Sequence, residues 1–216
     1  INSPNIIKWN IDKKYLIELK KSGINIAPTI FINNNNNTLY QLLNKTRWKQ
    51  AVIKPSISGA AKHTYLVNSN NYHKYENIFK EITKKECMLF QEFMDSITTQ
   101  GEISLIMIGG EYTHAVRKIA KEGDFRVQDD HGGQVIEYLA TKEEILFAKE
   151  CINKCPYKPI YARVDIIYDN QGDPSLSELE LIEPELWFRN NPESAKILAK
   201  EILQTLVNNK NIEKQV

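Results

Sequence analysis

Hydrophobic positions along the chain follow two periods, and their alternation outlines the secondary structure. Gly23 follows a basic turn and is typical of a helix end, while Thr141 and Pro192 are typical of helix starts. A helical spacing of apolar residues predicts five helices, within residues 12–23, 39–48, 70–85, 141–154 and 191–209.

Apolar and β-branched runs with strand character lie between these helices. The glycine pair at 109–110 indicates a hairpin turn, and the asparagine tract at 33–37 indicates a solvated loop. We predict strands within 24–32, on both sides of a loop in 50–67, at 87–93, at 102–108 and 112–119, and in a second hairpin that begins with 161–168.

Helices that alternate with antiparallel hairpins predict an α+β protein of two lobes, with the boundary near residues 90–95. No apolar run approaches the ~20 residues that span a bilayer. The 28 Lys and Arg residues nearly balance the 27 Asp and Glu residues, which disfavours nucleic-acid or anionic-membrane binding. Three cysteines, Cys87, Cys151 and Cys155, do not pair completely and fit a cytoplasmic protein.

The second hairpin concentrates carboxylates. Alternation puts Arg163 and Asp165 on one face of its first strand, and Glu178 and Glu180 on one face of its second. A turn centred at residues 171–172 would place Asp165 opposite Glu178 and Arg163 opposite Glu180. A register slip of one residue would separate them.

Like charges directly opposite one another destabilise a sheet. For two carboxylates ~4 Å apart at an effective dielectric of ~20, the repulsion is roughly 4 kcal/mol. A cation is therefore expected, and the residues leave two alternatives open. Arg163 could form an ion-pair network, or Mg²⁺ could bind the carboxylate oxygens and keep positions for water and phosphates.

Lys54 ends an apolar run before Pro55 and a loop of small residues around Gly59. Backbone N–H groups of such a loop can approach phosphate, and a strand-end lysine adds positive charge. The spacing differs from that of a Walker P-loop. The alternative is a lysine whose ammonium reaches solvent. Lys118 and Arg126 are further basic candidates, and the histidines show no metal-ligand spacing.

In order along the chain, these residues resemble the ATP-grasp superfamily, in particular the glutathione synthetase-like and ribosomal-protein-modifying carboxylate-amine ligases. The similarity runs from "WNIDKKYL", with Asp12 and Lys13, to "ELELIEP". Between them, "VIKPSISGAA" is similar to a phosphate loop, "MLFQEFM" to an adenine-binding hinge, "GEISL" to a ribose-binding position and "RKIAKEGDFRVQ" to a phosphate-facing segment.

The resemblance implies an ATP-grasp fold whose two lobes, each with an antiparallel sheet, hold ATP between them. Asp165, Glu178 and Glu180 would bind one or two Mg²⁺ ions, with Mn²⁺ as an alternative, although the family more often has Asn at the last position. Arg126, Arg163 and Lys118 would be catalytic at the acyl phosphate, and Glu183 would touch metal or amine. The implied nucleotide-binding residues are Lys13, Lys54, Gln91, Glu92, Phe93, Met94, Glu102, Lys118 and Arg126.

The resemblance also divides the chain into a leading segment and helix at 1–25, a small lobe at 26–92 and a large lobe with the metal site at 93–216. Members of the family usually carry an N-terminal α/β domain before the first helix. That domain is expected to be absent from this chain.

The implied activity is an ATP-dependent ligase that forms a C–N bond through an acyl phosphate. Its substrates would be a small-molecule or peptide carboxylate and an amine, and a homodimer is left open. Two alternatives remain: a kinase that phosphorylates a small-molecule hydroxyl, or an ATP-binding module without catalysis.

Overall fold

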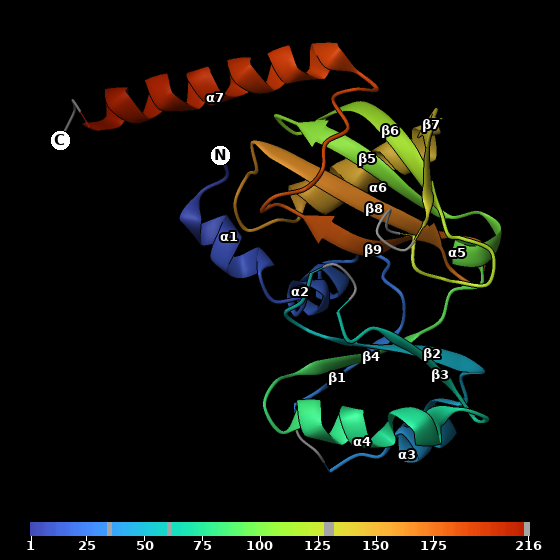
Figure 1. Cartoon of the computed structure of the whole chain (residues 1–216). Helices are drawn as coiled ribbons and strands as arrows, with labels where there is room; N and C mark the ends of the chain where they lie inside the picture. The colour runs from blue at the N-terminus through green and yellow to red at the C-terminus, as the bar shows by residue number, and fades with distance from the viewer. Residues whose placement is uncertain (34–35, 60–61, 128–131, 214–216) are drawn as a thin grey trace.

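The protein consists of two antiparallel sheets that face each other across a gap, each with helices on its outer side (Figure 1). The computed structural model describes residues 1–33, 36–59, 62–127 and 132–213. This arrangement confirms the predicted α+β class and the two lobes.

The smaller sheet has the strand order β1-β4-β2-β3. Its core combines one face of these strands with the helices α3 and α4, because residues such as Ala51, Ile53 and Phe90 alternate toward the helices. Thr38 and Gln41 form a capping box at the start of α3. The elements are β1 (Thr29–Ile32), α3 (Leu39–Thr46), β2 (Gln50–Pro55), β3 (Tyr65–Asn68), α4 (Tyr72–Thr83) and β4 (Met88–Glu92).

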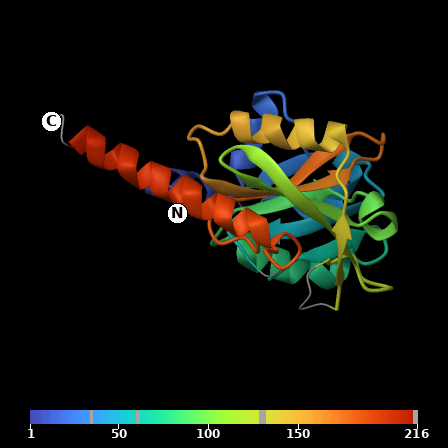
Figure 2. The same cartoon turned by 90° about the horizontal axis from the view of Figure 1, so that it is seen from above.

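The larger sheet has the order β7-β6-β5-β8-β9. Helix α6 covers its outer face (Figure 2), where Leu105, Val164 and Leu179 enter the main core. The predicted cap of α6 is confirmed, because Thr141 and Glu144 form a capping box. The elements are α5 (Ser96–Thr99), β5 (Glu102–Ile108), β6 (Glu111–Ile119), β7 (Gln134–Tyr138), α6 (Lys142–Asn153), β8 (Tyr161–Tyr168), β9 (Pro174–Glu180) and α7 (Pro192–Glu213).

The N-terminal segment closes the free edge of β9. Helix α1 (Pro4–Asn10) ends at Asn10. Its side-chain Nδ2 donates to the backbone carbonyl of Leu179 (2.8 Å), and its Oδ1 accepts from the backbone N–H of Leu181 (3.0 Å). Tyr15, at the start of α2 (Tyr15–Lys21), accepts a hydrogen bond from the Leu179 amide. Both helices therefore pack with the larger sheet, which blocks further strand addition at this edge.

Helix α7 starts at Pro192, as predicted, and extends away from the body of the protein (Figures 1 and 2). Its side chains at 203, 206 and 207 are exposed. Within the described residues, no helix is long and apolar enough to cross a membrane.

The predicted hairpin register is confirmed. Arg163 pairs with Glu180 and Asp165 with Glu178, and an irregularity follows Asp165. The helix predicted at 12–23 begins later, at Tyr15, and Lys13 lies in the turn before it.

Three short elements, α1, α5 and β7, were not predicted. The signals of α1 are nevertheless in the sequence, because Ser3 caps the helix and Pro4 occupies its first turn. The parts of the asparagine tract and of the small-residue loop at 34–35 and 60–61 lie outside the described residues, as do residues 128–131.

Candidate active site

A cavity of about 630 Å³ lies between the two sheets. Successive side chains of β2 point to opposite faces of the smaller sheet. Ile53 enters the core of the small lobe, so its neighbours Val52 and Lys54 face the cavity. Every site residue predicted from the sequence lines this one cavity, namely Lys13, Lys54, Gln91, Glu92, Phe93, Met94, Glu102, Lys118, Arg126, Arg163, Asp165, Glu178, Glu180 and Glu183.

The segment at residues 91–94, which leads from the smaller sheet to the larger lobe and is called the hinge below, lines one end of the cavity. The amide of Phe93 donates to Gln50 on β2 (3.1 Å), and its carbonyl accepts from the side chain of Asn170 in the β8–β9 turn (3.3 Å). The side chain of Gln91 donates to Thr29 (2.9 Å). These bonds fix the hinge to both lobes.

Apolar side chains that the sequence analysis missed complete this end. Phe125 contacts Phe93 edge to face, with ring centroids 6.1 Å apart. Alternation could have found Ile167, which lies two residues after Asp165 on β8 and lines the same cavity. The apolar residues that line this end are Val52, Phe93, Met94, Ile97, Phe125 and Ile167, a surface suited to a flat, apolar ligand face.

Lys54 lines the cavity without a partner among the described residues, because no ion pair or hydrogen bond from them reaches its ammonium. Burial lowers the pKa of Lys54 below the usual lysine value, although the charge of Glu178 opposes the shift. A desolvated ammonium of this kind gains from an anionic ligand.

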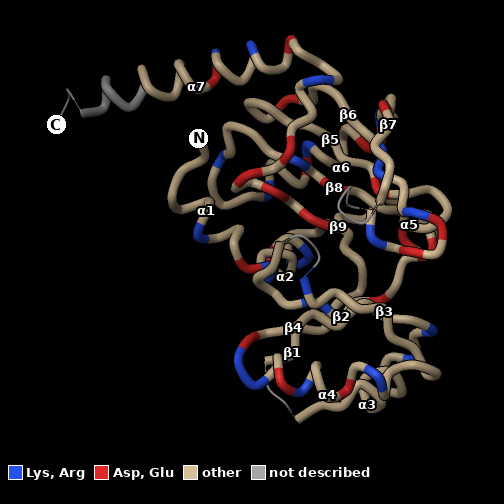
Figure 3. Tube along the Cα trace, in the orientation of Figure 1, with Lys and Arg blue, Asp and Glu red and all other residues tan. Residues whose placement is uncertain are grey.

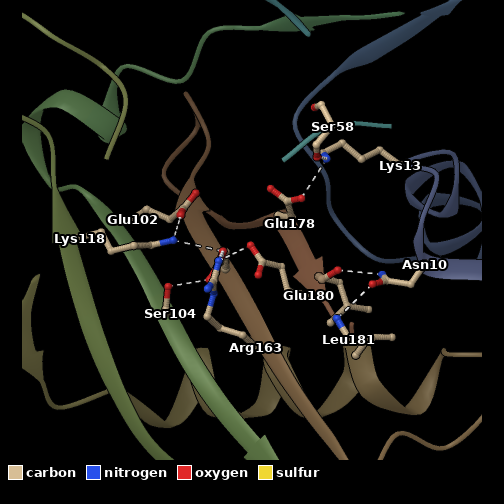
Figure 4. A network of polar contacts seen from close by, with 12 residues as sticks. Asn10, Lys13, Ser58, Glu102, Ser104, Lys118, Arg163, Glu178, Glu180 and Leu181 are labelled. Atoms are coloured by element: carbon tan, nitrogen blue, oxygen red, sulfur yellow. Dashed lines mark hydrogen bonds and ion pairs between the residues drawn. The ribbon is translucent and has the colours of Figure 1, made fainter. Parts of the chain in front are cut away.

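Lys13 joins three parts of the site (Figure 4). Its ammonium donates to the carbonyl of Ser58 (2.9 Å) and lies 3.1 Å from a Glu178 oxygen. Its backbone amide donates to the carbonyl of Ser56 (2.9 Å). The turn before α2 is thereby tied to the small-residue loop and to β9.

Asp165 is the centre of a buried ionic network, and Figure 4 labels its neighbours Ser104, Lys118 and Arg163. Ser104 donates to its Oδ1 (2.6 Å), and Arg163 donates to both oxygens, through Nε to Oδ1 and Nη2 to Oδ2 at 2.9 Å each. Lys118 lies 3.2 Å from Oδ2 and also pairs with Glu102. Arg163 pairs in addition with Glu180.

The network sets the protonation of its members. Burial alone would raise the pKa of Asp165, but Arg163 and Lys118 hold it well below its usual range. Burial would lower the pKa of Lys118, yet Asp165 and Glu102 raise it. Burial raises the pKa of Glu180 to about 7 against the opposing charge of Arg163.

The carboxylates of the hairpin are therefore compensated by protein cations, which is the ion-pair alternative left open by the sequence. Figure 3 shows acidic residues along β9 and the segment after it, close to basic residues. Lys13 pairs with Glu178, and Arg163 with Asp165 and Glu180.

Gly101 lets β5 approach β6 at this site. Its φ is +78°, and a Cβ there would lie 2.3 Å from the carbonyl oxygen of Lys118. Only glycine fits this position without moving one strand. The close approach sets Glu102 opposite Lys118.

Arg126 lines the cavity but is bound to a neighbour. Its guanidinium donates to Asp124 through Nε (3.1 Å to Oδ1) and Nη2 (2.7 Å to Oδ2). These bonds hold the pKa of Asp124 well below its usual range. A ligand would reach Arg126 as part of this pair.

The donor types suit Mg²⁺, but no metal-binding cage is preformed. Across the described ranges, no three His, Cys, Asp or Glu side chains group so as to hold a metal ion. Both oxygens of Asp165 already accept hydrogen bonds, whereas Glu178 and Glu180 keep about a third of their side-chain surface accessible, 32% and 31%. Mg²⁺ is usually held by one or two carboxylates together with substrate phosphates, and these two glutamates fit that role.

Comparison with known proteins places this architecture among ATP-grasp proteins. The RimK-like ATP-grasp domain family matches residues 12–180. The cycloserine biosynthesis protein DcsG of Streptomyces lavendulae is 22% identical over 93% of this chain and 71% of its own. The crystal structure of D-cycloserine synthetase DcsG has a TM-score of 0.80 at 21% identity, again over 93% and 71% of the two chains.

Two further solved structures share the fold. The D-alanine–D-alanine ligase of Bacillus anthracis has a TM-score of 0.68 at 18% identity, over 94% of this chain and 69% of its own. The ATP-grasp ligase PsnB, complexed with a minimal precursor, Mg and ADP, has a TM-score of 0.66 at 14% identity, over 93% of this chain. The chain spans 61% of PsnB.

The fold and the cavity define an ATP-grasp protein. Because the family match covers most of its length, the chain belongs to the RimK-like ATP-grasp domain family.

Proposed function

We propose that this protein is an ATP-dependent ligase that joins a carboxylate to an amine through an acyl phosphate. The observation that carries the proposal is a cavity in which an apolar end, a set of carboxylates and Lys54, which has no ion-pair partner among the described residues, lie together. DcsG, PsnB and D-alanine–D-alanine ligase, which share the fold, are named as a synthetase and ligases.

The nucleotide would lie with its base at the hinge, between Val52 and Ile167, and its phosphates toward Lys13 and Lys54. Lys54 supports this orientation because desolvation lowers its pKa and no described residue forms an ion pair with its ammonium. Glu102 is the candidate for the ribose, although its carboxylate is paired with Lys118.

Mg²⁺ would be held by Glu178 and Glu180, with Asp165 as the third ligand predicted from the sequence. When bound, the ion offsets negative charge on the phosphates. Asp165 also has a role of its own, since it orients Arg163 and Lys118 toward the cavity.

In the proposed reaction, a substrate carboxylate oxygen attacks the γ-phosphorus, the bond to the bridging oxygen breaks, and ADP leaves. The amine then attacks the acyl carbon, the C–O bond to phosphate breaks with its electron pair, and the amine loses a proton. Arg163 and Lys118 would stabilise charge on the transferring group, because both are buried and fixed by ion pairs with Asp165. Arg126 would also act at the acyl phosphate, and Glu183 would touch the metal or the amine.

The test is ADP release across a panel of amino acids, small acids and peptides, with and without amines, followed by hydroxylamine trapping. An acyl phosphate yields a hydroxamate, so the ligase predicts one from the acid that stimulates ADP release. Asp165→Asn is the inactive control, and Asp173→Asn, on the exposed turn, is its matched active control.

The alternatives give other outcomes. A kinase would release ADP with a hydroxyl substrate and form no hydroxamate. A binding module would show a higher Tm with MgATP and only background ADP release with every acid and amine. Absence of MgATP binding would reject all three.

A further inference from the structure

Arg163 lies on the inner face of the larger sheet, between the ionic network of the cavity and an apolar cluster. Toward the cavity, β8 carries Asp165, and in the other direction β5 carries Ile106 and Ile108, which enter an apolar cluster with Trp187. The guanidinium of Arg163 therefore has ions on one side and the Trp187 ring on the other, with its central carbon 5.2 Å from the ring centroid.

Trp187 has an unfavourable local conformation. Its φ is +42°, in the left-handed region that bulky residues rarely adopt. Such a conformation costs free energy and persists only where the surrounding structure enforces it. Its buried Nε1 also has no hydrogen-bond partner among the described residues. Two local costs at one residue are typical of a functional constraint.

The surroundings of Trp187 enforce this conformation. His114 Nε2 donates to the carbonyl of Leu186 (3.0 Å), and the amide of Asn190 donates to the carbonyl of Trp187 (2.9 Å). The residue itself is 4% exposed. Its backbone is held on both sides, while no hydrogen bond within the described chain holds its indole.

We propose that Trp187 is a positioning residue that holds the guanidinium of Arg163 at the cavity. Asp165 and Glu180 hold Arg163 in this structure, but both are also candidate metal ligands. A ligand that engages those carboxylates would weaken their hold on Arg163. A cation over an indole face is attracted to the ring without using a carboxylate, so the ring keeps the guanidinium in place for an anion.

This inference rests on the proposed function for its purpose, but the first experiment does not depend on it. The Nε–H signal of Arg163, assigned by its loss in Arg163→Lys, reports both the ring above it and its access to water. Trp187→Leu should move the signal downfield by removing the ring current and should speed its exchange with solvent at least about tenfold. Trp187→Phe keeps an aromatic face and should retain most of both properties.

Trp48→Leu is the matched control. Trp48 also stacks in the structure, on Phe90 with ring centroids 5.4 Å apart, but it belongs to the smaller lobe. The Trp48→Leu variant should have a lower Tm and an unchanged Arg163 signal. An Arg163 signal that is the same in the wild type and in Trp187→Leu would overturn the proposal.

The second experiment measures ADP release. Trp187→Leu should lower kcat at least about tenfold and leave the KM for ATP within about twofold, because the hinge and Lys54 are untouched. Trp187→Phe should restore most of kcat. A rise in KM with kcat unchanged, or no rescue by Phe, would indicate a merely structural role. If the wild type neither binds nor hydrolyses MgATP, the proposed function fails, and the Arg163 signal still tests Trp187.

Discussion

The ammonium of Lys13 lies between a carboxylate of one lobe and a carbonyl of the other, 3.1 Å from Glu178 and 2.9 Å from Ser58. Lys13 thus connects β9 of the larger sheet with the loop that follows β2. The contact brings the small-residue loop to the acidic end of the cavity.

Lys13→Met should weaken MgATP binding at least about tenfold, equivalent to about 1.4 kcal/mol. It removes both a charge for the phosphates and the link to Ser58. Isothermal calorimetry measures the Kd. Lys14→Met is the matched control, because Lys14 pairs with Asp12 and its side chain is 46% exposed. Equal Kd values for the two variants would contradict the assigned role of Lys13.

Lys54→Met should change stability and binding in opposite directions. Lys54 is half-buried in the wild type, and no ion pair reaches its ammonium from the described residues. The variant should therefore have a higher free energy of unfolding, while its affinity for ATP should fall at least about tenfold. Urea unfolding and calorimetry on the same samples measure both. A variant that is less stable than the wild type would show that Lys54 has a compensating partner.

The pH dependence of this difference follows from the lowered pKa of Lys54. Between the folded pKa and the unfolded value of about 10.4, the unfolded chain binds more protons, so stability rises with pH. The stability advantage of Lys54→Met should therefore shrink as the pH is raised from 7 toward 10. Urea unfolding of both proteins at several pH values tests this. A stability advantage of Lys54→Met that grows with pH would mean that the pKa of Lys54 is raised, not lowered, in the folded state.

The pairing of Arg163 with Glu180 and of Asp165 with Glu178 could be predicted from the sequence because it depends on local rules. Strand alternation decides which side chains share a face, and the length of the turn fixes the register. A two-residue period and a turn signal were sufficient. The ordered motifs then placed the cavity residues without any knowledge of their contacts.

Contacts between distant segments could not be predicted in this way. Asn10 binds the edge of β9 more than 160 residues away along the chain, and no local pattern links them. The bond of Arg126 to Asp124 and the left-handed backbone of Trp187 depend on tertiary packing. The sequence could therefore indicate an excess of carboxylates, but not which cations neutralise them.

Asp165→Asn should destabilise the protein by about 3–5 kcal/mol near neutral pH, because it leaves Arg163 and Lys118 buried with less compensating charge. The pKa of Asp165 is held low in the folded state, so its contribution is present above the unfolded value of about 3.9 and is lost as the pH falls through the folded value. Urea unfolding from pH 7 to pH 3 should show that the difference in stability from the wild type narrows below about pH 5. Asp173→Asn should match the wild type throughout.

Glu144 provides a test of stability away from the cavity. It is fully buried and accepts hydrogen bonds from Tyr138 (3.0 Å), Tyr168 (2.7 Å) and the amide of Thr141 (2.7 Å). Glu144→Ala removes the half of the α6 capping box that binds the Thr141 amide and leaves two hydroxyls without their acceptor, so the free energy of unfolding should fall by about 2–4 kcal/mol. Because α6 covers the outer face of the sheet, the Kd for MgATP at 10 °C should stay within about twofold of the wild-type value, which calorimetry measures. Glu143→Ala, at the exposed neighbouring position, should change neither quantity. A loss of MgATP affinity in Glu144→Ala while the protein stays folded would mean that the two faces of the larger sheet are coupled, and that the site depends on more than the cavity side chains.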